Sequence, residues 1–141
     1  MSTVFIGVDA GGTGTRALVA SAAGEVLGRG RAAGASAWSS GTAPSEALSE
    51  AVAEALGAHD PSTVGAGVIA AAGAVSSVPE HAAAVKRAWH DLGIRARPRI
   101  VLDVVAAFAA GTVVSRGLVL AVGTGAVAAL VDEGRLVRRA V

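Results

Sequence analysis

The sequence contains no cysteine among its 141 residues. Disulfides, cysteine-based zinc sites and iron–sulfur clusters are therefore excluded for this chain. Aromatic residues are scarce as well, at 3% of the sequence, so alanine, valine and leucine must fill the core. Side chains of this size favour closely packed layers of helices and strands over a sandwich with a bulky core.

Charged residues are also few, at 16%, and the formal net charge is +1. This balance argues against a nucleic-acid or membrane-surface partner recruited by bulk charge. The basic residues are eleven arginines and a single lysine, Lys86, with small arginine clusters in residues 95–99 and 135–139. We interpret these clusters as solvated or interface residues, and a homodimer is left open.

A membrane-targeting segment is not evident. The amino terminus has no basic stretch, and its first apolar run ends at Asp9, which does not fit a signal peptide. The longest uncharged stretch, residues 61–79, contains three glycines, four serines or threonines and a proline at each end, a poor composition for a membrane helix. With 52% hydrophobic residues, we expect a globular, soluble, cytoplasmic protein.

Hydrophobic periodicity predicts an α/β fold. Helical spacing marks residues 44–56, 79–92 and a segment from about 104 to 110. The expected strands cover residues 3–8, 15–20, 26–31, 64–71, 99–102, 117–122, 126–131 and 135–141. The order βββαβαβα predicts a mixed sheet covered by helices. The last strands restart the opening pattern, so we expect a first lobe over 1–114 and the start of a truncated second lobe over 115–141.

A glycine-rich segment after the first strand suggests a phosphate-binding turn. Asp9 would stand at the strand end, followed by Gly11, Gly12, Thr13, Gly14 and Thr15. Glycines let the main chain approach a phosphate, threonine hydroxyls can add hydrogen bonds, and the carboxylate of Asp9 can hold a magnesium ion. A plain β-turn rich in glycine and threonine is the alternative.

Two further segments fit the same chemistry. Gly123, Thr124 and Gly125 interrupt two strands in the same way, although a simple hairpin explains them as well. Asp103 lies where a short strand meets a helix. It could take the proton of an attacking hydroxyl group, or it could cap the helix. The three segments together favour a phosphate site more strongly than each does alone.

Other phosphate-binding loops fit less well. The sequence has no P-loop motif. Gly12-x-Gly14-x-x-Ala17 and Gly123-x-Gly125-x-x-Ala128 match the dinucleotide fingerprint in its alanine form. That fingerprint must open a helix, whereas the residues after Gly14 have the pattern of a strand. A nicotinamide site is therefore disfavoured.

At these segments the chain resembles the sugar kinase, Hsp70 and actin superfamily, with its ribonuclease H-like fold. Residues 7–15, 100–107 and 120–125 are similar to its first phosphate motif, connecting segment and second phosphate motif. Within it, the chain most resembles the BadF/BadG/BcrA/BcrD ATPase family, which includes N-acetylglucosamine kinases. The Gly73 loop and residues 106–111 are similar to that branch too.

The resemblance implies ATP and Mg²⁺ as cofactors, with Asp9 ordering the metal and Asp103 activating a sugar hydroxyl. The implied phosphate contacts are Gly11, Gly12, Thr13, Gly14, Thr15, Gly123, Thr124 and Gly125. The implied sugar contacts are Ser36, Trp38, Gly73 and Asp103. The chain differs from the family pattern at Ser36, Leu102 and Ala126. It also lacks a counterpart of the adenosine-binding segment, so we expect a fragment with little activity alone.

The resulting hypothesis is phosphorylation of an amino sugar by ATP, with N-acetylglucosamine or glucosamine as substrate. Three alternatives remain. One is an ATP-driven activator of a reductase or dehydratase, although those relatives carry a cysteine-bound cluster. Another is a non-catalytic nucleotide-binding domain. The last is a ribonuclease-H-like nuclease, which would need more clustered carboxylates than Asp9 and Asp103.

Overall fold

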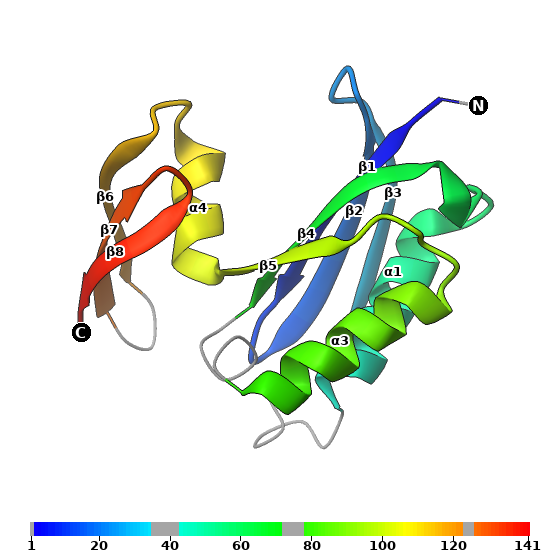
Figure 1. Cartoon of the computed structure of the whole chain (residues 1–141), viewed down its shortest axis with the longest axis horizontal. Coiled ribbons are helices and arrows are strands. Elements are labelled where there is room, and N and C mark those ends of the chain that lie inside the picture. Colours follow the sequence, from blue (N-terminus) through cyan, green and yellow to red (C-terminus); the bar gives the residue numbers. More distant parts are fainter. Residues whose placement is uncertain (1, 35–42, 72–77, 123–125) are drawn as a thin grey trace. The chain divides into compact units, whose positions relative to one another are not determined.

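A computed structural model describes residues 2–34, 43–71, 78–122 and 126–141. The chain divides into two compact units, Met1–Ile100 and Val101–Val141. Figure 1 shows the elements of both units.

The first unit is built on a five-stranded sheet in the order β3-β2-β1-β4-β5. The strands of this sheet are β1 (Val4–Ala10), β2 (Gly14–Ser21), β3 (Val26–Ala33), β4 (Val64–Ala71) and β5 (Pro98–Leu102), whose last two residues fall in the second unit. The strands β1, β2 and β3 form an antiparallel meander, whereas β1 and β4 pair in parallel. The sheet is therefore mixed, as the order of elements predicted.

Two helices cover one face of this sheet, α1 (Pro44–Leu56) and α3 (Pro79–Asp91). Each has a proline in its first turn, where the missing amide proton costs no hydrogen bond. A short 3-10 turn, η1 (Pro61–Thr63), precedes β4. Figure 1 shows the two helices side by side against the sheet. One apolar cluster joins the inward side chains of the strands to those of both helices, with Val19, Val52 and Trp89 fully buried.

Small residues allow α1 to lie unusually close to β3. A β-carbon on Gly30 would overlap the carbonyl oxygen of Ala51, and one on Gly28 would overlap that of Ala55. On β4, a β-carbon on Gly67 would occupy the space of the Trp89 indole. The core of this unit thus depends on glycine in the sheet as much as on the apolar side chains of the helices.

The opposite face of the sheet carries alternate residues of the same strands. Buried and exposed positions alternate strictly along β1, which places Phe5, Gly7 and Asp9 on this open face. Phe5 and Val68 remain 39% and 40% exposed. Among the described residues of the first unit, no helix covers this face, so side chains at the ends of its strands are accessible.

The second unit combines one helix with a three-stranded antiparallel sheet in the order β6-β7-β8. Its elements are α4 (Asp103–Gly111), β6 (Arg116–Val122), β7 (Ala126–Asp132) and β8 (Arg135–Ala140). Its core is formed by Val104, Val105, Phe108, Ala129 and Val131. Glu133 and Gly134 have positive φ angles of 48° and 69°, as a tight hairpin turn between β7 and β8 requires.

The observed order of elements confirms the predicted βββαβαβα followed by further strands. The helix α4, which the sequence analysis assigned to the first lobe, belongs to the second compact unit. Phe108 of α4 packs directly against the backbone at Gly117 of β6, and the apolar face of α4 joins the core of that sheet. The lobe boundary after residue 114 stays a prediction.

The described helices include none that is both long and apolar enough to cross a membrane.

Candidate nucleotide-binding site

The predicted first phosphate motif forms the hairpin between β1 and β2. Ala10 pairs with Thr15, and the amide of Gly11 donates a hydrogen bond to the carbonyl oxygen of Gly14 at 3.1 Å. The segment after Gly14 is a strand, as expected, and it opens no helix. This rules out the geometry that a dinucleotide fingerprint requires at Gly12 and Gly14.

Asp9 lies near the end of β1 on the open face of the sheet, where its carboxylate is exposed. Arg16 of β2 stands directly opposite it in the register of the two strands. Within the described part of the chain, Asp9 forms no ion pair with Arg16 or another cation. The carboxylate is therefore available to a ligand or a metal ion.

The turn itself is packed against the end of β3. Gly14 pairs with Ala33, and a β-carbon on the next residue, Gly34, would overlap the backbone of Gly12 and Thr13. This backbone-to-backbone approach fixes the turn before a ligand arrives. The Gly11 amide is already engaged within the turn, so exposed Thr13 at its tip is the residue best placed to donate to a phosphate.

Thr15 is placed differently from the rest of the motif. It lies on the helix-covered face, is 1% exposed, and its Oγ1 has no hydrogen-bond partner among the described residues. Asp9 and Thr15 therefore point to opposite faces of the sheet, because side chains alternate along each strand. The structure does not bring the Thr15 hydroxyl to the face that carries Asp9, and a phosphate contact from it stays a prediction.

Asp103 is the first residue of α4 and is exposed. Its Oδ1 accepts a hydrogen bond from the backbone amide of Val104 at 2.8 Å. One carboxylate oxygen therefore satisfies an amide in the first turn of the helix, close to the capping role that the sequence left open. The side chain remains accessible to a substrate, so the role of Asp103 as a base is still a prediction.

Six predicted site residues lie outside the described residues. They are Ser36, Trp38, Gly73, Gly123, Thr124 and Gly125. The strands that flank the last three are described, and they pair antiparallel from Val122 with Ala126 onward. A strand, a three-residue link and a second strand thus follow one another as the sequence predicted.

The fit of a magnesium ion can be judged from the donors present. The described residues contain no group of three or more histidine, cysteine, aspartate or glutamate side chains able to hold a metal on their own. Mg²⁺ with a nucleotide needs only one or two carboxylates, because phosphate oxygens and water complete its shell. An unpaired, exposed Asp9 beside the turn fits that requirement.

Trp89 and His90 have structural roles. The indole of Trp89 is fully buried and its Nε1 donates to the carbonyl oxygen of Ala96 at 2.8 Å. His90 lies at the end of α3, with its Nδ1 2.9 Å from the carbonyl oxygen of Ile94. Arg16 was not predicted as a site residue, although a hairpin register drawn from Asp9 would have placed it on the same face.

Sequence comparison finds no family profile and no curated protein that matches the chain. Structural comparison does find relatives. A structure assigned as an N-acetylglucosamine kinase from Porphyromonas gingivalis is 24% identical, with a TM-score of 0.72, over 96% of this chain and 47% of that one. A ROK family glucokinase from Streptomyces griseus, in complex with glucose and AMPPNP, is 26% identical, with a TM-score of 0.64, over 94% and 46%.

A third similar structure is MreB 5 of Spiroplasma citri bound to AMPPNP, at 16% identity and a TM-score of 0.62, over 99% of this chain and 53% of that one. The chain thus has the predicted actin-like ATPase fold, shared with sugar kinases and a nucleotide-bound MreB. It spans about half the length of each of these structures.

Proposed function

We propose that this chain is the nucleotide-binding part of an ATP-dependent sugar kinase. The observation that carries the proposal is the hairpin from Asp9 to Gly14, with an exposed, unpaired carboxylate beside a preformed glycine-rich turn. This hairpin belongs to a fold that the chain shares with a glucokinase whose structure contains glucose and AMPPNP.

In this proposal, the turn and Asp9 position the nucleotide. Thr13 and the backbone around it contact phosphate oxygens, and Asp9 holds Mg²⁺ directly or through water. The metal, when bound, neutralises phosphate charge during transfer. Arg16, opposite Asp9 on the open face, adds a positive charge near the same phosphates. The residues Gly123, Thr124 and Gly125 would grip the phosphates from the second hairpin.

Asp103 is the proposed base. It would accept the proton of a sugar hydroxyl while the oxygen attacks the γ-phosphorus and ADP leaves. The exposed side chain retains a second carboxylate oxygen for this task, because Oδ1 accepts the hydrogen bond from the Val104 amide.

We further propose an amino sugar, N-acetylglucosamine or glucosamine, as substrate, with Ser36, Trp38 and Gly73 facing it. We also propose a cytoplasmic location and membership of the BadF/BadG/BcrA/BcrD family.

The main rival is an ATPase that drives a partner protein instead of phosphorylating a sugar. The absence of cysteine weighs against a cluster-bearing activator, and the likeness to two kinases favours sugar transfer. A nucleotide-binding domain without catalysis would share the Asp9 hairpin but would not need Asp103.

One experiment separates these functions. ADP release by the complete gene product is measured with N-acetylglucosamine, with glucosamine, with glucose and without sugar. The proposal predicts turnover that requires a sugar and falls by at least about 100-fold in Asp103→Ala, the usual range for loss of a general base. Asp91→Ala, which removes an exposed aspartate of α3, is the matched control and should retain turnover. Sugar-independent turnover would refute the kinase assignment.

A further inference from the structure

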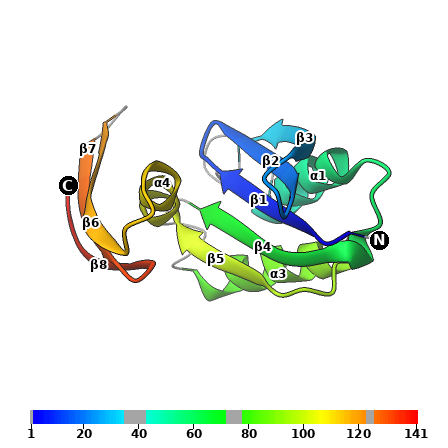
Figure 2. The same cartoon turned by 90° about the horizontal axis from the view of Figure 1, so that it is seen from above.

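The first unit contains a positively charged pocket between α3 and the segment that leads into β5. It has a volume of about 350 Å³ and is lined by Lys86, His90, Arg97 and Pro98. Its size lies within the range of small-ligand pockets. The helix α3 runs back from the end where β1 and β4 finish (Figures 1 and 2), and Lys86 and His90 lie in its second half.

Two side-chain hydrogen bonds hold the walls of this pocket together. The Nε1 of Trp89 donates to the carbonyl oxygen of Ala96 at 2.8 Å, and the Nδ1 of His90 lies 2.9 Å from the carbonyl oxygen of Ile94. A carbonyl oxygen only accepts, so the Nδ1 of His90 donates this hydrogen bond. Trp89 and Ile94 are buried, at 0% and 1% exposure, so the segment that carries Arg97 is fixed beside the end of α3.

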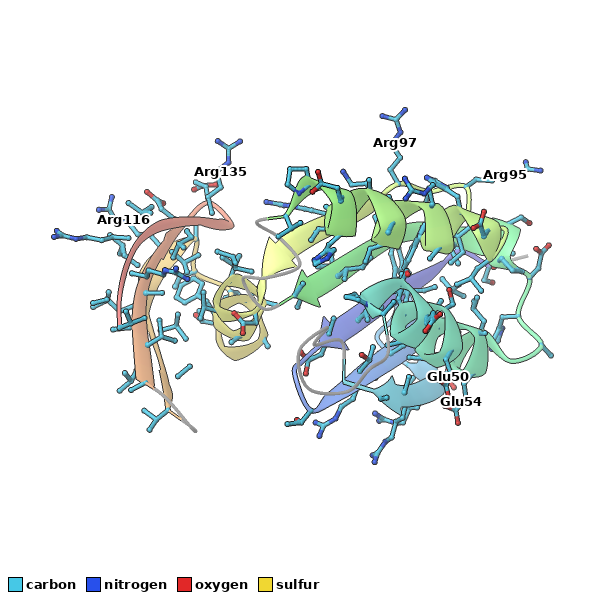
Figure 3. The ribbon with its side chains drawn as sticks, turned by 90° about the horizontal axis from the view of Figure 1, so that it is seen from below. Glu50, Glu54, Arg95, Arg97, Arg116 and Arg135 are labelled. Carbon is cyan, nitrogen blue, oxygen red and sulfur yellow. The ribbon has the colours of Figure 1, made fainter. Side chains whose placement is uncertain are left out.

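Among the residues that the structure describes, the cations of the pocket have no acidic partners. No carboxylate lines it, and neither Lys86 nor Arg97 forms an ion pair with another described residue. Figure 3 shows Arg97 projecting into solvent from the segment between α3 and β5. Asp91, which follows His90 at the end of α3, lines a different groove, between α1 and α3. Arg95 differs from Arg97, since its charge contributes to the lowered pKa of Asp60.

We propose that this pocket binds the phosphate group of a small molecule, separately from the nucleotide turn. The guanidinium of Arg97 can bind two oxygens of a phosphate at once, and the ammonium of Lys86 supplies a point charge. The imidazole of His90 lines the same pocket, so its signals report on binding there. Two cations without acidic partners among the described residues, Lys86 and Arg97, suit a dianionic, tetrahedral ligand.

The test uses the 141-residue chain and the imidazole NMR signals of its three histidines. Inorganic phosphate, a hexose 6-phosphate and the matching free hexose are titrated in turn, with sodium chloride as the control for ionic strength. We expect saturable shifts at His90 with both phosphates, none with the free hexose, and no comparable shifts at His59 and His81. Tighter binding of the hexose phosphate than of free phosphate would identify the phosphate monoester as the ligand.

The double variant Lys86→Gln/Arg97→Gln should weaken phosphate binding at His90 by about tenfold or more, the loss expected for charge-assisted hydrogen bonds. Arg135→Gln/Arg139→Gln removes the same charge from the second unit and should leave binding unchanged. Asp9→Asn should also leave it unchanged, which separates this pocket from the nucleotide turn. The proposal is overturned if chloride shifts the His90 signals as much as phosphate does, or if Lys86→Gln/Arg97→Gln binds phosphate normally. It is also overturned if a DNA duplex, titrated in the same way, shifts the His90 signals and the small phosphates do not.

Discussion

Asp60 shows how a single carboxylate is held by the main chain at the start of η1. Its Oδ1 accepts a hydrogen bond from the backbone amide of Ser62 at 2.8 Å, while the hydroxyl of Thr63 donates to its carbonyl oxygen at 2.7 Å. Hydrogen bonds from the backbone and side chain of Ser62 lower the pKa of Asp60, and the charge of Arg95 adds a smaller effect. The ionised form of Asp60 therefore favours the folded state.

This lowered pKa predicts a pH-dependent contribution to stability. The contribution is present above the ordinary aspartate pKa of about 4 and is lost as the pH falls through the lower value of the folded state. Asp60→Asn lacks the titrating group. The gap in urea midpoint between the wild type and this variant should therefore narrow between about pH 5 and pH 2. A gap that stays constant over this interval would show that Asp60 does not stabilise the fold through its charge.

Asp9 and Thr15 show what could be predicted for single residues and what could not. The sequence correctly predicted a glycine-rich turn after a buried strand, because the residue types determine it locally. The face on which each side chain lies depends on the pairing of β1 with β2. That register places Asp9 opposite Arg16 and Thr15 opposite Ala10, with Thr15 in the core. The six site residues outside the described structure remain untested by it.

At the scale of elements, the contact between α1 and β3 depends on the absence of a side chain at Gly30. A β-carbon there would overlap the backbone of α1, which cannot move aside as a flexible side chain could. We therefore expect Gly30→Ala to destabilise the chain by about 3 kcal/mol, the upper range for overpacking. Urea unfolding followed by circular dichroism would measure the loss.

Gly7→Ala is the matched control for that variant. Gly7 lies on β1 and has no positive φ angle, and no atom lies within 4 Å of the position that a β-carbon would take there. Its replacement should change the free energy of unfolding by less than about 0.5 kcal/mol. Equal losses in the two variants would mean that the close approach of α1 to β3 does not contribute to stability.

The elements were predictable because each is marked by a period and by its end signals. Proline opens α1 and α3, and Gly57 and Gly93, both with positive φ, follow their ends. The sequence also indicated a repeat of the opening pattern. The strands β6, β7 and β8 form an antiparallel meander like that of β1, β2 and β3, each with one register shift between its second and third strands. The packing of α4 could not be predicted, since it depends on long-range contacts such as that of Phe108 with Gly117.

At the scale of the whole molecule, the length of the chain determines how much sugar phosphorylation we expect from it. The chain spans about half of the sugar kinases that share its fold. We expect the isolated 141-residue chain to show little or no sugar phosphorylation, because catalysis needs substrates held in one precise arrangement. ADP release by the isolated chain with N-acetylglucosamine and ATP is the relevant measurement. Turnover of about 1 per second or faster, within the range of kinases, would refute this expectation.

The central claim is that the turn beside Asp9 binds nucleotide phosphates. The most direct test is titration of the ¹⁵N-labelled chain with AMPPNP and Mg²⁺, following each backbone amide by NMR. The account predicts that the largest shifts occur at residues 11–14, persist in Lys86→Gln/Arg97→Gln, and weaken in Asp9→Asn. Shifts confined to other parts of the chain, or unaffected by loss of the Asp9 carboxylate, would contradict it.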